Sequence, residues 1–154
     1  TYDLKPQMSV LEVTDRFLEA WAAGPEKDGV PYTLAVCNLA NPDMVGHTGV
    51  IPAAVAAIEA VDAGGSQVLA ALERKGGTAL ITADHGNADK MLSQDGSPFT
   101  AHTTAPVPLA LVDFAETGRT LDGRLGALCD IAPTLLELIG LEAPAAMTGR
   151  SLLA

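Results

Sequence analysis

The chain has 154 residues, of which 48% are hydrophobic and 18% charged. This composition excludes an intrinsically disordered chain and is typical of one globular domain that buries a substantial core. Nine basic and nineteen acidic side chains give a net charge of −10, which argues against nucleic acid or an anionic membrane surface as a partner.

The N-terminal part predicts a helix followed by a strand. Residues 9–21 place apolar side chains at helical spacing, so we expect an amphipathic helix. A polar turn with Gly and Pro follows over residues 22–31. Residues 32–39 form an apolar run without clean alternation, which predicts a strand that a parallel sheet buries on both faces.

The later elements continue this alternation of helices and strands. We expect a helix over 50–75 that Gly64 and Gly65 could interrupt, strands over 78–83 and 107–112, and a helix over 125–139 that starts properly near Asp130. Strands that alternate with helices predict an α/β sandwich with a mostly parallel sheet. No apolar run approaches the roughly 20 residues of a membrane span.

The cysteines and the first residue bear on the origin of the chain. Cys37 and Cys129 lie in apolar runs, so we expect buried thiols and a reducing, cytoplasmic environment. The sequence opens at Thr1 without an initiator Met or a signal-like segment. We therefore expect a mature form or a part of a longer protein.

All three histidines lie in predicted loops that also carry acid, Gly or Thr. His47 and His85 follow two of the predicted strands, where ligands collect outside the carboxyl ends of a parallel sheet. Asp43 precedes His47 by four positions, as in one helical turn or a tight loop, Asp84 adjoins His85, and His102 lies in a third loop. Carboxylates and imidazoles are ligands of Mn²⁺, Zn²⁺ or Fe²⁺, and pairs of such ions serve phosphoryl chemistry.

These loops also have simpler interpretations. An Asp–His pair in a turn often serves as a cap, and NPDMVGHTG fits a strand-to-helix turn capped by Thr48. Asp89 is interpreted as a solvated surface acid. No serine lies in a G-x-S-x-G or phosphate-loop context. The residues therefore indicate a candidate metal platform without a nucleophile.

The order and spacing of several motifs resemble those of the cofactor-independent phosphoglycerate mutases, which belong to the alkaline phosphatase superfamily. They run from Tyr2 to Leu152 and are YDLKPQMS, NLANPDMVGHTG, ITADHGNADKM, AHTTAPVPLALV, DIAPTLLELIG and MTGRSL. They correspond only to the C-terminal part of such an enzyme. The resemblance implies that residues 1–154 form the C-terminal portion of its metal-binding domain, an incomplete, alkaline-phosphatase-like, three-layer α/β/α sandwich.

The resemblance also implies a ligand set. Asp43, His47 and His102 look like ligands of one Mn²⁺, and Asp84 and His85 like ligands of a second, with Zn²⁺ or Co²⁺ as alternatives. In the family, an aspartate and the serine nucleophile complete the second site, and an inserted domain grips the substrate. We expect these parts upstream of this chain, which then supplies no catalytic nucleophile.

The reaction implied by the resemblance interconverts 3-phosphoglycerate and 2-phosphoglycerate through a phosphoserine, in glycolysis and gluconeogenesis, without 2,3-bisphosphoglycerate. We expect the chain alone to be inactive, and its partners to be the phosphoglycerate substrate and the N-terminal remainder of the enzyme. Ala105 stands where the family usually has Asn, so we expect altered hydrogen bonding in that loop but unaltered ligation. Another superfamily enzyme, a phosphatase or phosphopentomutase, and a non-catalytic metal-binding module are the alternatives.

Overall fold

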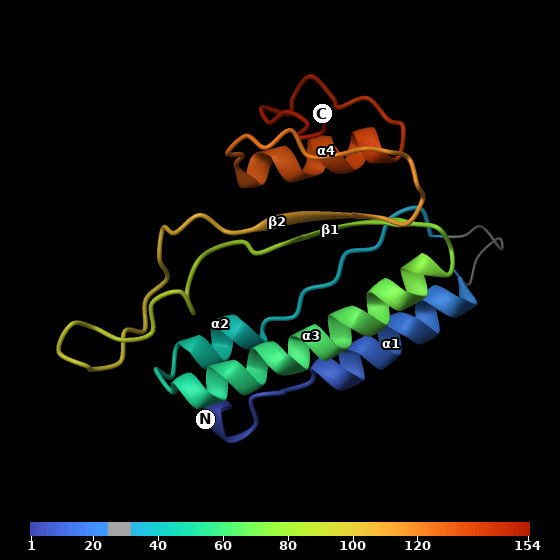
Figure 1. The fold of residues 1–154 in the computed structure, drawn as a ribbon. Helices are drawn as coiled ribbons and strands as arrows, with labels where there is room; N and C mark the ends of the chain where they lie inside the picture. The colour runs from blue at the N-terminus through green and yellow to red at the C-terminus, as the bar shows by residue number, and fades with distance from the viewer. Residues whose placement is uncertain (25–31) are drawn as a thin grey trace. The chain divides into compact units, whose positions relative to one another are not determined.

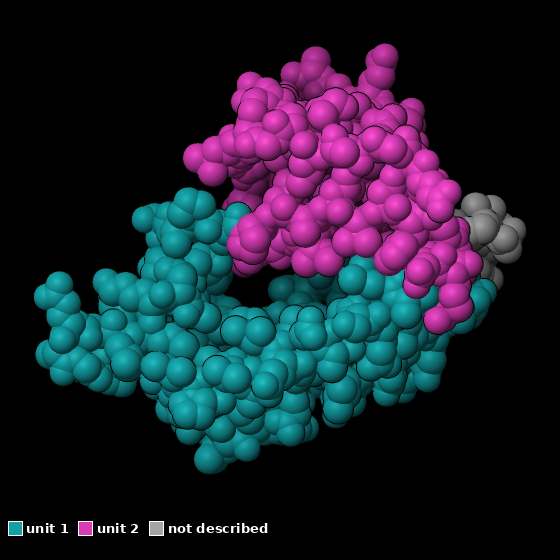
Figure 2. Space-filling view, viewed as in Figure 1, with its two compact units in different colours: residues 1–71, 85–107 teal, residues 72–84, 108–154 magenta. Residues whose placement is uncertain are grey.

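The computed structural model describes residues 1–24 and 32–154, so the turn predicted over 22–31 lies mostly outside the described residues. The chain divides into two compact units (Figure 2). The first unit comprises residues 1–71 and 85–107, and the second comprises residues 72–84 and 108–154. Four of the five candidate metal ligands belong to the first unit, and Asp84 belongs to the second.

Helices dominate the N-terminal half of the chain (Figure 1). The elements in chain order are the 3-10 turn η1 (Tyr2–Leu4), α1 (Val10–Ala23), α2 (Asn41–Gly46) and α3 (Ile51–Glu73). The helices predicted over 9–21 and 50–75 are confirmed, and the two glycines do not interrupt α3. Residues 41–46, which were predicted to lie in a loop, form the short helix α2.

α3 packs on α1 through a glycine. A side-chain carbon added at Gly64 would lie 2.6 Å from Thr14 Oγ1 and 3.3 Å from Val10 Cγ2, whereas one added at Gly65 would have no atom within 4 Å. Val10 and Thr14 are buried on α1. The absence of a side chain at Gly64 therefore lets the two helices approach closely. A second cluster of buried apolar residues packs α2 and α3 against the loop after His85, and comprises Val45, Ala53, Ala54, Ala57 and Met91.

The prediction of a strand over residues 32–39 is wrong for this structure. The segment forms no strand, and Leu34 and Val36 are 48% and 83% exposed. An apolar strand is stable when neighbouring strands and covering helices shield both faces, and these exposed side chains lack that cover. Cys37 in this segment is exposed, as is Cys129, so the prediction of buried thiols is also wrong; both cysteines are free.

The second unit contains a two-stranded sheet and the C-terminal helix. Its elements are β1 (Thr78–Thr82), β2 (Leu109–Asp113), the 3-10 turn η2 (Leu128–Asp130) and α4 (Ile131–Leu138). Both strands were predicted, but they pair antiparallel, with Leu80 opposite Leu111. The prediction of a parallel sheet is therefore wrong for this pair of strands. Residues 83–108 return the chain without the helical crossover that parallel pairing needs.

Asp130 organises the end of the second unit, and α4 begins directly after it, as predicted. Its Oδ1 accepts a hydrogen bond from the Arg150 amide and its Oδ2 one from the Ala127 amide, both at 2.8 Å. These hydrogen bonds, that from Arg150 foremost, hold the pKa of the Asp130 carboxyl below its ordinary value. The buried Thr134 hydroxyl donates to the Asp130 carbonyl at 2.7 Å and accepts from the Leu152 amide at 3.0 Å.

α3 meets the length and composition criteria for a membrane span. Core helices of water-soluble proteins meet the same criteria, so a single such helix is weak evidence. α3 carries Glu59 and Asp62 near its middle and packs one face on α1 through Gly64. These features do not indicate a membrane helix.

Replacing Gly64 by Ala should lower the free energy of unfolding by about 1–3 kcal/mol, because the added methyl group would overlap Thr14. The same replacement at Gly65 meets open space. It should raise the free energy of unfolding by about 0.5–1 kcal/mol through helix propensity. Urea unfolding followed by circular dichroism measures both effects, and equal effects would contradict the close packing at Gly64.

Candidate metal centre

α2 presents Asp43 and His47 on one face. NPDMVG begins a helix readily, because Pro42 fits the first turn and the Asp43 carboxylate there is favoured by the positive end of the helix. The His47 amide donates to the Asp43 carbonyl at 3.2 Å, which closes one helical turn. The spacing of four residues therefore places both side chains on the same side of the helix.

A bridge between two loops holds His85 near His102. The Thr103 amide donates to the Gly86 carbonyl at 2.8 Å, as an isolated antiparallel bridge. The rings of His85 and His102 stack with their centroids 3.7 Å apart. Neighbouring residues in each loop thus fix the separation of the two imidazoles.

Asp89 anchors the loop that carries His102. The Thr103 hydroxyl lies 2.8 Å and 2.9 Å from the two carboxylate oxygens of Asp89 and donates to them. Asp89 is exposed, as expected for a surface acid, and in addition it accepts these hydrogen bonds from Thr103. The Ala105 amide donates to the Thr103 hydroxyl at 3.4 Å. The Thr103 hydroxyl thus contacts both Asp89 and the backbone at Ala105 in the loop of His102. The side chain of Ala105 is apolar and adds no hydrogen bond.

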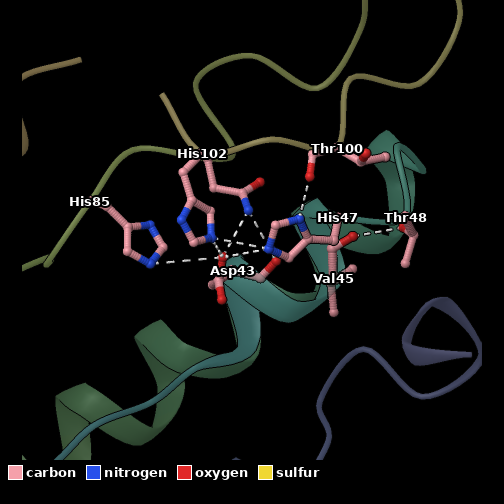
Figure 3. A network of polar contacts seen from close by, with 8 residues as sticks. Asp43, Val45, His47, Thr48, His85, Thr100 and His102 are labelled. Atoms are coloured by element: carbon pink, nitrogen blue, oxygen red, sulfur yellow. Dashed lines mark hydrogen bonds and ion pairs between the residues drawn. The ribbon is translucent and has the colours of Figure 1, made fainter. Parts of the chain in front are cut away.

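The side chains of Asp43, His47, His85 and His102 converge (Figure 3). Asp43 Oδ1 lies 3.1 Å from His47 Nε2 and 3.1 Å from His102 Nε2, and the two nitrogens are themselves 3.1 Å apart. His85 Nε2 lies farther away, 4.0 Å from Asp43 Oδ1. Asp43, His85 and His102 also offer ligand atoms that all lie within 4.8 Å of one another.

The separation of 3.1 Å between these donors fits adjacent ligands of one metal ion. Imidazole and carboxylate ligands lie about 2.0–2.2 Å from Zn²⁺. Two such ligands are therefore about 3 Å apart at a right angle and at most about 4.2–4.4 Å apart when opposite. Without a cation or a shared proton, a carboxylate and two imidazole lone pairs at this distance would repel one another. The donor set is thus suited to a divalent cation.

A backbone carbonyl orients the His47 ring. His47 Nδ1 lies 2.6 Å from the Thr100 carbonyl oxygen, which can only accept, so Nδ1 carries a proton and donates it. In the neutral ring, the Nε2 lone pair then faces Asp43 and His102, as ligation requires. Thr100 acts through its backbone, so no side-chain signal in the sequence identifies it.

Asn87 is a second contributor that the sequence analysis missed. Its side chain is buried, and its Nδ2 donates to Asp43 Oδ1 at 2.8 Å. Gly46 makes room for it, since a side-chain carbon there would lie 2.2 Å from Asn87 Oδ1. The available signal was the position of Asn87 two residues after His85, within the same turn.

Asp84, the remaining predicted ligand, follows β1 in the second unit and is exposed. The structure brings the other predicted ligands together within the first unit. The role of Asp84 in a second metal site stays a prediction.

The fold and the site define the class of protein: the chain belongs to the Metalloenzyme superfamily, whose family model matches residues 1–143. The particular relatives are named 2,3-bisphosphoglycerate-independent phosphoglycerate mutase. The chain is 58% identical over 153 residues to the one from Syntrophotalea carbinolica and 54% identical over 154 residues to the one from Ruegeria pomeroyi. Each match covers 99% of this chain but only 28% of the length of the relative.

A solved structure shows the same fold. Crystal structures of Leishmania mexicana phosphoglycerate mutase at low cobalt concentration include a chain that matches this one with a TM-score of 0.85 and 30% sequence identity. The match covers 99% of this chain and 29% of that chain. The resemblance to the mutases and the incomplete α/β fold class inferred from the sequence are thereby confirmed.

In the neutral imidazole of His47 we expect the proton on Nδ1 in the metal-free chain, because the Thr100 carbonyl accepts it. Side-chain ¹⁵N chemical shifts, assigned with a His47→Ala variant, distinguish the two tautomers. A proton on Nε2 instead would contradict the orientation of this ring.

Proposed function

We propose that this chain is the metal-binding C-terminal portion of a 2,3-bisphosphoglycerate-independent phosphoglycerate mutase. This enzyme is an isomerase that interconverts 3-phosphoglycerate and 2-phosphoglycerate, in cytoplasmic glycolysis and gluconeogenesis. The observation that carries the proposal is the set of three donors at 3.1 Å from one another, on Asp43, His47 and His102. These donors occur in a chain of which 99% is matched, at 58% identity, by an enzyme of that name.

We assign Asp43, His47 and His102 to one Mn²⁺, and Asp84 and His85 to a second. The equal separations within the first set support its assignment to one ion. His85 Nε2, 4.0 Å from Asp43 Oδ1, is within reach of the same ion, so its assignment to the second ion rests on the resemblance to the mutases. Zn²⁺ and Co²⁺ accept the same ligands. The cobalt named for the L. mexicana structure supports a first-row divalent ion in this chain.

When bound, the ions supply positive charge that stabilises developing charge on the transferring phosphoryl oxygens. The residues of this chain hold and orient that charge. Asp43 brings the anionic ligand at the start of α2, and His47 presents its Nε2 lone pair because Thr100 accepts the proton of Nδ1. The His102 side chain is 49% exposed, so the site is accessible to a substrate. No residue of this chain is assigned as the nucleophile.

The partner that we propose for this chain is the remainder of the same enzyme. Exposed apolar side chains on residues 32–39 support this, because Leu34 and Val36 would be covered by a neighbouring part of the fold. The net charge of −10 gives the chain little means to hold a phosphorylated acid by itself. The basic side chains that would bind the substrate and the attacking serine are assigned to that partner on the resemblance to the mutases.

Isothermal titration with Mn²⁺ tests the metal site directly. Asp43→Asn should weaken binding by more than about 100-fold, because losing a ligand exceeds the 10- to 100-fold effect of an outer-shell change. Asp62→Asn on the exposed surface of α3 makes the same change of charge away from the site and should leave the affinity unchanged. Equal affinities of wild type and Asp43→Asn would refute the assignment of Asp43.

The purified chain should show no conversion of 3-phosphoglycerate in a coupled assay, because the nucleophile is assigned outside it. The Asp43→Asn variant, purified in parallel, controls for contaminating mutase. Turnover by the wild-type chain that this substitution abolishes would contradict the proposal that a further part of the enzyme is required.

A further inference from the structure

We infer, on the basis of the proposed metal site, that Asn87 is a positioning residue that holds the Asp43 carboxylate in its ligating orientation. Asn87 is only 6% exposed, although its side chain is polar. Its Nδ2 donates to Asp43 Oδ1 at 2.8 Å and lies 3.3 Å from the Asp43 carbonyl oxygen. One amide group thus contacts both the side chain and the backbone of a single candidate ligand.

The orientation of the Asn87 amide is determined by its neighbours. Both atoms of Asp43 within reach are oxygens, which can only accept from Asn87 when the carboxylate is ionised. The amide nitrogen must therefore face Asp43, and the amide oxygen must face Gly46. Any side chain at Gly46 would fill that space, since its first carbon would lie 2.2 Å from Asn87 Oδ1.

The oxygen end of Asn87 shows that fold stability alone does not explain this residue. Within residues 1–24 and 32–154, no donor reaches the buried Asn87 Oδ1. Buried polar atoms are normally hydrogen-bonded, and one that is not calls for an explanation. The contact of the opposite end of the amide with Asp43 supplies that explanation.

The hydrogen bond from Asn87 directs the ligating oxygen itself. Asp43 Oδ1 is the atom that lies 3.1 Å from both His47 Nε2 and His102 Nε2. A neutral donor on this oxygen restricts rotation of the carboxylate and leaves its negative charge in place. Asn87 also follows His85 in the same turn, so the contact ties that turn to α2.

Two variants test this role. Asn87→Leu keeps the branching and the number of side-chain heavy atoms but removes the donor, and Asn87→Ala removes the donor without adding bulk. Asn38→Leu, at an exposed position of the first unit, is the matched control. For each protein, Co²⁺ affinity is measured by calorimetry, the visible absorption of the Co²⁺-loaded chain by spectroscopy, and thermal unfolding in the presence of a chelator.

Both Asn87 variants should bind Co²⁺ about 10- to 100-fold more weakly, as expected for a residue that orients a ligand. Their Co²⁺ absorption bands should shift, while the metal-free unfolding temperature of Asn87→Leu stays at or above that of the wild type. The control should match the wild type in all three measurements.

Wild-type affinity and an unchanged spectrum in both variants would overturn the positioning role while leaving the proposed metal site intact. A lower metal-free unfolding temperature with an unchanged spectrum would show a structural role only, which also overturns the inference. If the wild-type chain itself failed to bind Co²⁺, the proposed metal site and the inference would both be refuted.

Discussion

The mutual repulsion of a carboxylate and neighbouring imidazole lone pairs is the constraint on which the candidate metal site depends. Asp43 Oδ1, His47 Nε2 and His102 Nε2 lie 3.1 Å from one another, a spacing that becomes favourable when a cation or a shared proton lies among them. Several contacts keep these donors together. α2 holds Asp43 and His47 on one helical turn, and the bridge between Gly86 and Thr103 holds the loop that carries His102. Backbone hydrogen bonds maintain both the helix and the bridge.

The surrounding structure controls orientation as well as distance. The Thr100 carbonyl sets the tautomer of His47, and the Asn87 amide donates to the carboxylate of Asp43. Gly46 and Gly86 serve the same end, because a side chain at either would collide with the residue that anchors a loop. The small cluster of valine, alanine and methionine side chains behind α2 gives this platform a rigid base. The site is thus built by packing and hydrogen bonding within one unit of the chain.

Much of the site was predictable because ligand chemistry is carried by side-chain type. Every histidine of the chain lies in it, and the spacing of Asp43 and His47 matches one helical turn. Helix periodicity likewise predicted α1 and α3, and Pro133 placed the start of α4 near Asp130. Residues 32–39 failed as a strand because local hydrophobicity does not supply the neighbours that bury it. Thr100 and Asn87 were missed because a backbone carbonyl and a single amide acquire their roles only from the folded positions of distant residues.

Side-chain ¹⁵N NMR of the chain during titration with Zn²⁺ tests the central claim most directly, because all of its three histidines belong to the candidate site. Zn²⁺ is diamagnetic and accepts the same nitrogen and oxygen ligands. We expect the Nε2 resonances of His47 and His102 to move together and to saturate at the same metal ratio, while His47 Nδ1 stays protonated and donates to Thr100. Nε2 resonances that stay unmoved while Zn²⁺ is added in excess would contradict it.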